Sequence, residues 1–270
     1  MVGGGHRRRL RRGPLGRRTE AGAGDRPESA PPCSGRQSPE PGRDQEGPVK
    51  DDDIADLIRS AQQELAELPA GNRFVDLLEA GELSRETLGV LARELYRLVR
   101  SDLSSFALLA SRFPSPPAGD LFLTMAQGEA QALRLLLGFA AALGMDEQQL
   151  ASHEPRPFAQ AYPAYLAQTA LRGTRSDTAL ALLANAEGSG RQYARVAGAL
   201  RSRYGFGEES VEHFLFFADT PQELLDLAVE TLKEGLSGGD DPADALRTAR
   251  TAHAYEAAFW AALTEDADAG

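Results

Sequence analysis

From residue 51 onward, apolar residues recur at helical spacing, and this periodicity is what most restricts the fold. The clearest case is segment 244–263, which contains the only tryptophan of the chain. Ala252, Phe259, Trp260 and Leu263 fall on one face of that segment, as in a helix that buries a single stripe. No alternating strand pattern or hairpin turn competes with it, so we expect an all-α fold.

The expected helices begin and end at recognisable signals. Ser84 is a suitable N-cap for a long helix that ends before Pro114. Thr220 opens a capping box with proline at the first helical position, and glycines 188 and 190 should interrupt another helix. Short loops join about eight helices in such a bundle. They are expected at 54–65, 85–112, 120–143, 157–172, 177–204, 209–218, 220–232 and 244–263.

Residues 1–48 differ in composition from the rest of the chain. They are rich in Gly, Pro, Arg and Ser and are net positive, whereas the whole chain has a net charge of −11. Such a segment buries too little apolar surface to order itself, so we expect a disordered extension; the alternative is a basic arm that touches anionic surfaces. The acidic remainder argues against nucleic acid as the main ligand. We expect one helical domain over residues 49–266.

The single cysteine, Cys33, lies in that N-terminal segment. Residues 49–266 therefore hold no disulfide, as expected in a reducing compartment. No apolar run reaches the roughly 20 residues that span a bilayer. The N-terminal arginines are not followed by the apolar stretch of a secretory signal. We expect a cytoplasmic protein with no membrane partner.

Three acidic residues lie on otherwise apolar faces of three different expected helices: Asp102, Glu129 and Glu256. Burying a carboxylate costs free energy unless the group is paired, neutral or aimed at a ligand. Three of them suggest a shared pocket inside the bundle, suited to acid–base chemistry or metal binding. The alternative is that each pairs with a tyrosine hydroxyl or an arginine. Candidate arginines are Arg97, Arg134 and Arg250.

The positions of the histidines help to decide between acid–base chemistry and metal binding. His253 and Glu256 form a His-x-x-Glu pair, but the repeated Glu-x-x-His of a di-metal bundle does not occur. We expect no metal and no cofactor, with His153 and His213 as surface or capping residues. Ser189, between two glycines, could be exposed, but no histidine is obviously paired with it, which argues against a Ser–His hydrolase.

The segment from Tyr255 to Trp260, Tyr-Glu-Ala-Ala-Phe-Trp, resembles the C-terminal Glu-x-x-Phe-Trp motif of the TenA/PqqC (thiaminase II-like) family. The similarity extends over about residues 72–265. It implies a haem oxygenase-like helical bundle around an internal pocket, and commonly a homo-oligomer. Supporting pieces are Gly81-Glu-Leu-Ser, Gly128-Glu129, and Arg156-Pro157 ahead of Tyr162 and Tyr165.

The chain departs from the family pattern at the nucleophile. The thiaminase branch uses a cysteine on the helix that matches 177–204, where this chain has Ser189 or Glu187 instead. A branch without the cysteine works with glutamates, so the resemblance implies Glu187 and Glu256 as the catalytic set. The family's pyrimidine-contacting Gln-Asp pair falls at Glu94-Leu95.

The di-iron oxidase branch of the family carries a His-x-x-x-Asp-x-x-His pattern. Asp219 matches its aspartate, but Leu215 and Gln222 stand at the histidine positions.

The resemblance implies a divergent TenA-like protein that binds a small heterocycle and hydrolyses a thiamine-related aminopyrimidine. Glu256 would hold the amino group and move a proton. The alternatives are a metal-dependent oxidase of the same fold, using the three buried acids and His253, and a non-catalytic ligand-binding or regulatory protein. The expected ligand-binding residues are Asp102, Glu129, Tyr162, Tyr165, Phe259 and Trp260.

Overall fold

The computed structural model describes residues 50–68 and 71–264. Within these ranges it has ten α-helices, one short 3₁₀ helix and no strand, which confirms the all-α prediction. The extension expected at 1–48 lies outside the described residues. The elements are α1 (Asp51–Ala66), α2 (Arg73–Ala80), α3 (Arg85–Arg112), α4 (Ala118–Ala142), α5 (Glu147–Ala151), η1 (Phe158–Gln160), α6 (Ala161–Arg172), α7 (Arg175–Tyr204), α8 (Glu208–Ala218), α9 (Gln222–Ser237) and α10 (Pro242–Ala262).

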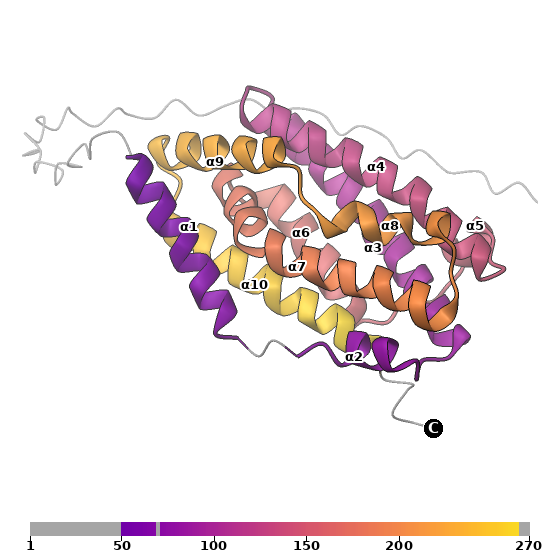
Figure 1. The fold of residues 1–270 in the computed structure, drawn as a ribbon. Coiled ribbons are helices and arrows are strands. Elements are labelled where there is room, and N and C mark those ends of the chain that lie inside the picture. The colour runs from indigo at the N-terminus through magenta and orange to yellow at the C-terminus, as the bar shows by residue number, and fades with distance from the viewer. Residues whose placement is uncertain (1–49, 69–70, 265–270) are drawn as a thin grey trace, which may run out of the picture. The chain divides into compact units, whose positions relative to one another are not determined.

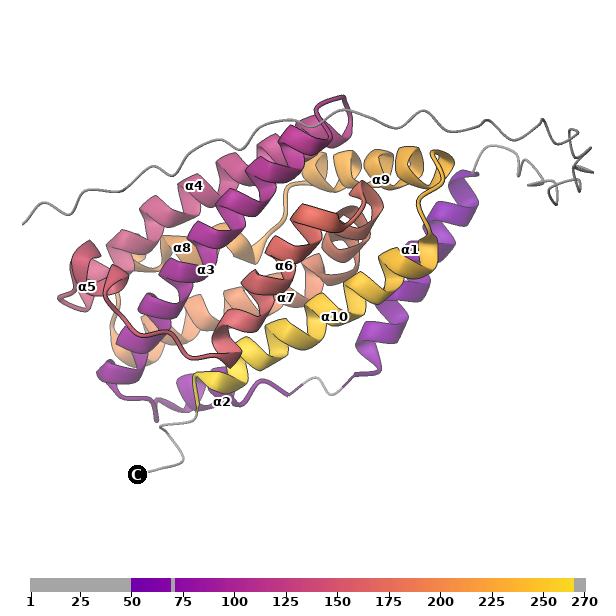
Figure 2. The same ribbon diagram turned by 180° about the vertical axis from the view of Figure 1, so that it is seen from behind.

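The long helices α3, α4, α7 and α10 run along one common direction (Figures 1 and 2). Helix α3 packs on α4 and α6, while α7 packs on α8, α9 and α10. This arrangement leaves α3 and α4 on one side of the bundle interior and α7 and α10 on the other.

The core divides into two clusters of buried apolar residues along the bundle. One cluster contains Phe74, Phe139, Phe214 and Trp260. The other contains Phe106, with residues of α4, α7, α9 and α10. Because α3 contributes to both clusters, it fixes the two ends of the bundle relative to each other.

Helix α2 was not expected, although its start is readable in the sequence. The Asn72 side chain accepts a hydrogen bond from the Val75 amide, and Gly81 ends the helix in the left-handed conformation with φ 78°. Phe74 from this helix packs against the Trp260 ring, with centroids 5.7 Å apart. The helix therefore covers the end of the bundle near the tryptophan.

Three local predictions have different outcomes. The predicted N-cap Ser84 accepts a hydrogen bond from the Thr87 amide, as expected. The predicted capping box at Thr220 is wrong, because Pro221 occupies the N-cap and makes no side-chain cap. Helix α7 is also continuous through the glycines that should have interrupted it.

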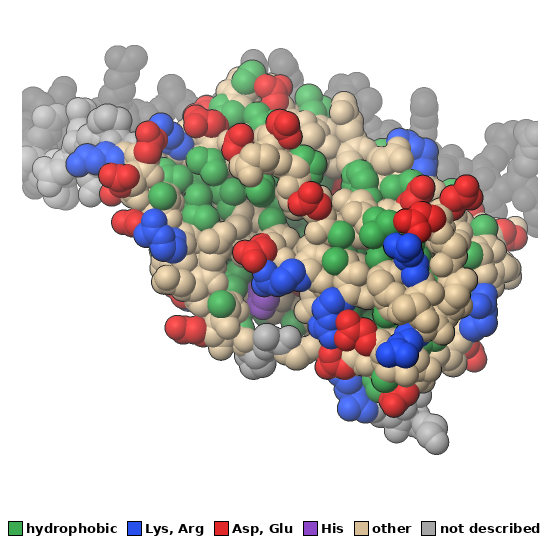
Figure 3. All heavy atoms as spheres, in the orientation of Figure 1, with side chains coloured by type: hydrophobic (Ala, Val, Ile, Leu, Met, Phe, Trp, Pro, Cys, Tyr) green, Lys and Arg blue, Asp and Glu red, His purple; other side chains and the backbone are tan. Residues whose placement is uncertain are grey.

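Gly190 instead allows a close helix contact. A Cβ atom at this position would lie 2.8 Å from the Ala218 carbonyl oxygen at the end of α8, whereas one at Gly188 would meet nothing within 4 Å. The absence of a side chain at Gly190 thus brings the end of α8 against α7. Hydrophobic side chains gather around a hollow on the face of the bundle that carries α7 and α9 (Figure 3).

None of the helices in the described ranges is both long and apolar enough to span a bilayer.

Candidate functional site

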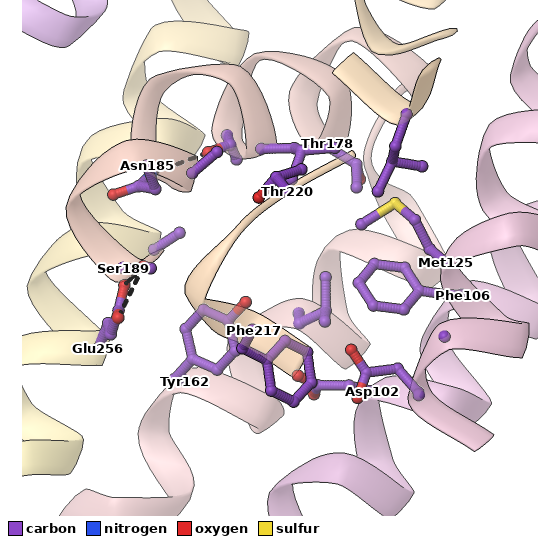
Figure 4. Close-up of a pocket in the computed structure, with 18 of the residues that line it drawn as sticks. Asp102, Phe106, Met125, Tyr162, Thr178, Asn185, Ser189, Phe217, Thr220 and Glu256 are labelled. Carbon is purple, nitrogen blue, oxygen red and sulfur yellow. Dashed lines mark hydrogen bonds between the residues drawn. The ribbon is translucent and has the colours of Figure 1, made fainter. Parts of the chain in front are cut away.

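A cavity of about 580 Å³ lies inside the bundle (Figure 4). Residues of α3, α4, α6, α7, α8, α9 and α10 line it, together with the connection between α8 and α9. Seven of the expected site residues meet there although they come from four helices. They are Asp102, Glu129, Tyr162, Tyr165, Glu256, Phe259 and Trp260.

Glu256 faces α7 across one side of the cavity. The Ser189 hydroxyl lies 2.7 Å from each carboxylate oxygen of Glu256 and donates to them (Figure 4). Burial raises the pKa of Glu256, and the Ser189 hydrogen bond partly opposes that rise. A half-buried carboxyl group with a raised pKa and one positioned donor is suited to taking up and releasing a proton.

Trp260 lies one helical turn beyond Glu256. Its indole N–H is near enough to lower the pKa of Glu256 but makes no hydrogen bond of normal geometry with any described residue. The ring is held by Phe74, Tyr193 and Phe259. An unused donor thus lies next to the acidic group on the cavity wall.

Asp102 and Glu129 form a second acidic group on α3 and α4. Asp102 is only 3% exposed, and its carboxylate points into the cavity (Figure 4). Burial and the neighbouring charge of Glu129 raise the pKa of Asp102, and burial raises the pKa of Glu129 to about 8. Oδ1 of Asp102 and Oε2 of Glu129 are buried without a hydrogen-bond partner among the described residues. Such groups cost free energy unless something binds them.

Arginines do not neutralise these acids. Arg97 donates to the backbone carbonyls of Ala151 and His153. The other two candidates are engaged elsewhere: Arg134 bonds Gln131, and Arg250 bonds Glu64. Among the described residues that line the cavity there is no arginine, lysine or histidine. The three candidate arginines therefore do not pair with the acids of the cavity.

Two tyrosines lie close enough to both acidic groups for their pKa values to respond to the carboxylates. Burial and the charges of Asp102, Glu129 and Glu256 raise the pKa values of both Tyr162 and Tyr193. Both phenols therefore stay protonated and can donate hydrogen bonds to a ligand. Tyr193 comes from α7 and lines the cavity beside the expected residues.

Several polar residues of the cavity were missed because each resembles an ordinary helix or cap residue in the sequence. Thr178 and Asn185 on α7 and Thr220 before α9 line the cavity. Asn185 is fixed by its donation to the Ala181 carbonyl oxygen at 2.9 Å. Only the helical spacing of Thr178, Asn185 and Ser189 could have indicated a polar stripe on α7.

Glu187 does not reach this site. Its side chain is 82% exposed and forms an ion pair with Arg191, and it does not line the cavity. Ser189, two residues farther along α7, contacts Glu256 instead. Of the expected catalytic pair, Glu256 thus lies on the cavity wall and Glu187 does not, because residues two apart on a helix point in different directions.

The three histidines that the structure describes also lie outside the cavity. His213 is fully buried, donates from Nδ1 to the Ala132 carbonyl oxygen at 2.9 Å, and has its pKa lowered by burial to about 4. Its prediction as a surface or capping residue is wrong. His253 donates to Asn185 at 2.9 Å. Within residues 50–68 and 71–264, no three His, Cys, Asp or Glu side chains are arranged to hold one metal ion.

Glu94 is buried, and its carboxylate forms hydrogen bonds with the segment before α6. Its carboxylate accepts hydrogen bonds from the Arg156 amide at 2.8 Å and from Gln160 at 2.7 Å, and lies 2.9 Å from Nε2 of His153. The acidic residues available to a ligand are therefore those on the cavity wall, and Glu94 is not one of them.

Comparison with solved structures identifies the fold. A domain with a haem oxygenase-like fold from Shewanella denitrificans has a TM-score of 0.63 at 14% identity, covering 82% of this chain and 94% of that chain. A TenA family transcription regulator from Silicibacter has a TM-score of 0.58 at 21% identity, covering 78% and 96%. A TenA homologue from P. horikoshii has a TM-score of 0.56 at 20% identity, covering 78% and 96%. These similarities confirm the haem oxygenase-like fold.

A search among curated protein sequences finds no match. The model of the TENA/THI-4/PQQC family matches residues 65–266, and that match includes the cavity and its acidic residues. The chain therefore belongs to the TENA/THI-4/PQQC family.

Proposed function

We propose that the chain binds a small amino-substituted heterocycle in the cavity and hydrolyses a C–N bond of a thiamine-related aminopyrimidine. Glu256 holds the amino group and takes a proton from the attacking water. The new C–O bond forms as the C–N bond breaks, and Glu256 returns the proton to the leaving nitrogen. No other reactant is needed.

The hydrogen bond between Ser189 and Glu256 carries this proposal. It fixes the carboxylate of a buried acid on the wall of a cavity large enough for a small heterocycle. Aromatic side chains from α6, α7 and α10 surround that wall and offer flat surfaces to a ring. Family membership adds to the proposal, since Glu256 lies in the family's C-terminal motif.

The test is turnover and calorimetric binding of the thiamine aminopyrimidine by the full chain and by Glu256→Gln. The amide keeps the size of the side chain but cannot carry the proton, so turnover should fall by at least about 100-fold with helix content unchanged. Glu187→Gln changes an exposed carboxylate on α7 and should leave turnover intact. Full activity of Glu256→Gln, or no binding of the aminopyrimidine by the unaltered chain, would overturn the proposal.

The family resemblance further leads us to propose a homo-oligomer. Large apolar side chains are exposed on the described surface, including Phe158 at 66% and Leu171 at 64%. Light scattering of the full chain tests this, and a monomer over the micromolar range would contradict it.

A further inference from the structure

We propose that the ligand of this cavity is elongated and carries an uncharged apolar chain, which extends from the ring held at Glu256 into a separate, apolar part of the cavity. The inference rests on the proposed function for the position of the ring. It adds a second region of contact, formed mainly by α3, α7 and α9, and it names the substrate class as a ring with an apolar substituent.

The first support is the length of the cavity along the helices. The residues of α7 that line it run from Thr178 to Tyr193, a stretch of helix about 22 Å long. On α10 the lining residues run from Thr248 to Trp260, about 18 Å by the same helical rise. The volume of about 580 Å³ is that of a pocket for a drug-sized ligand. A single ring at Glu256 therefore fills only one part of the cavity.

The second support is that the two ends of the cavity differ in chemistry. The end near Glu256 adjoins the core cluster that contains Trp260, and it offers the Ser189 hydroxyl and the Tyr193 phenol. The other end adjoins the second core cluster and is lined by apolar side chains, which we call the apolar compartment. These are Phe106, Met125, Leu166, Leu182, Leu224 and Leu227.

The apolar compartment lies apart from the Glu256 wall. Phe106 and Met125 stand across the cavity from Ser189 and Glu256 (Figure 4). Transfer of an apolar chain from water to such a surface is favourable in proportion to the area that it buries. A ligand that spans the cavity therefore gains most if its ring lies at Glu256 and its chain lies against Phe106 and Met125.

Polar side chains next to the apolar compartment are largely used by the protein itself. The Thr169 hydroxyl, one turn from Leu166, donates to the Tyr165 carbonyl oxygen at 3.0 Å. Asn185, one turn from Leu182, is bonded through its amide group to the α7 backbone and through Oδ1 to His253. Thr178 differs, because its Oγ1 is buried without a partner among the described residues. A chain that packs here thus displaces few hydrogen bonds to water.

The charge of the lining restricts the chain further. Asp219 and Glu223 are exposed, as are Thr124, Phe216 and Pro221, so the cavity opens between α4 and the connection that leads into α9. No basic side chain among the described residues lines the cavity, so an anionic chain end would find no counter-charge. The part of the ligand in the apolar compartment is therefore uncharged.

The test compares two ligands with the same ring, an aminopyrimidine that carries a pentyl group and one that carries a methyl group at the same position. Calorimetry with the full chain should show the pentyl compound binding on the order of 100-fold more tightly, the effect of burying about four additional methylene groups. Equal affinity of the two compounds would overturn the inference.

Two substitutions place this effect in the apolar compartment. Ala181 lines the cavity about 12 Å along α7 from Ser189, so Ala181→Leu should weaken the pentyl compound at least about tenfold and leave the methyl compound unaffected. Leu227→Gln keeps the size of the side chain but adds a polar group, and it should also reduce the preference. Ala194→Leu, an exposed change on α7 outside the cavity, should keep it.

An unchanged preference for the pentyl compound in those of the two variants that fold would also overturn the inference. Turnover of the thiamine aminopyrimidine without any chain-length preference would leave the proposed hydrolysis standing and remove only the apolar compartment as a binding region. A chain-length preference without turnover would do the reverse. Failure of both compounds to bind the unaltered chain would overturn both proposals.

Discussion

At the scale of single residues, Ser189 partly offsets the effect of burial on the pKa of Glu256. Its hydroxyl lies 2.7 Å from both carboxylate oxygens, and the hydrogen bond opposes the rise in pKa that burial causes. A hydrogen bond to the charged form of an acid favours that form. The Ser189 hydroxyl can thus act on the pKa of Glu256 without touching a ligand.

Ser189→Ala should raise the pKa of Glu256 further, because the only opposing side-chain hydroxyl is lost. If ionised Glu256 accepts the proton from water, the rising limb of the kcat/KM profile should move to higher pH. Ser189→Thr keeps a hydroxyl at the same place and should restore the limb towards its original position. A limb that is unmoved in Ser189→Ala would show that the hydrogen bond does not tune Glu256.

At the scale of elements, Gly190 of α7 allows the close contact with the end of α8, whereas Gly188 takes no part in it. A Cβ at Gly190 would lie 2.8 Å from the Ala218 carbonyl oxygen, closer than side-chain carbons approach backbone oxygens, while Gly188 faces open space. The contact lies just before Asp219 and Thr220, which line the cavity. Packing at Gly190 is thus coupled to the position of the connection between α8 and α9.

Gly190→Ala should lower the free energy of unfolding by about 1–3 kcal/mol through overpacking. Gly188→Ala should leave it unchanged or raise it by up to about 1 kcal/mol, because alanine is the better helix former. Urea unfolding of the two variants side by side measures the difference. Equal effects of the two substitutions would contradict the close contact.

Local spacing in the sequence predicts where most helices begin and end. It does not predict which side chains of different helices contact one another. The α3 bounds follow from Ser84 and Pro114, and the apolar stripe of α10 identifies Phe259 and Trp260 as buried. Glu187 and Ser189 are only two residues apart, and which of them faces α10 depends on how α7 is rotated against it. That rotation is a tertiary property, so sequence spacing could not separate the two residues.

At the scale of the whole molecule, the cavity makes stability depend on pH. Burial raises the pKa values of Asp102, Glu129 and Glu256 above their usual range. A carboxyl group whose pKa is higher in the folded chain favours folding below its unfolded pKa, and this contribution is lost as the pH rises through the folded value. With the cavity empty, the protein should therefore become less stable from about pH 4.5 to about pH 8.

Glu129→Gln should remove much of the loss of folding stability at high pH, because the amide fills the same space and does not ionise. Relative to the unaltered chain, the variant should be more stable at pH 8 by on the order of 4 kcal/mol, and nearly equal at pH 4.5. Urea unfolding at the two pH values gives the difference, with Glu212→Gln as the control for loss of an exposed carboxylate. Equal pH dependence in all three proteins would mean that Glu129 ionises freely.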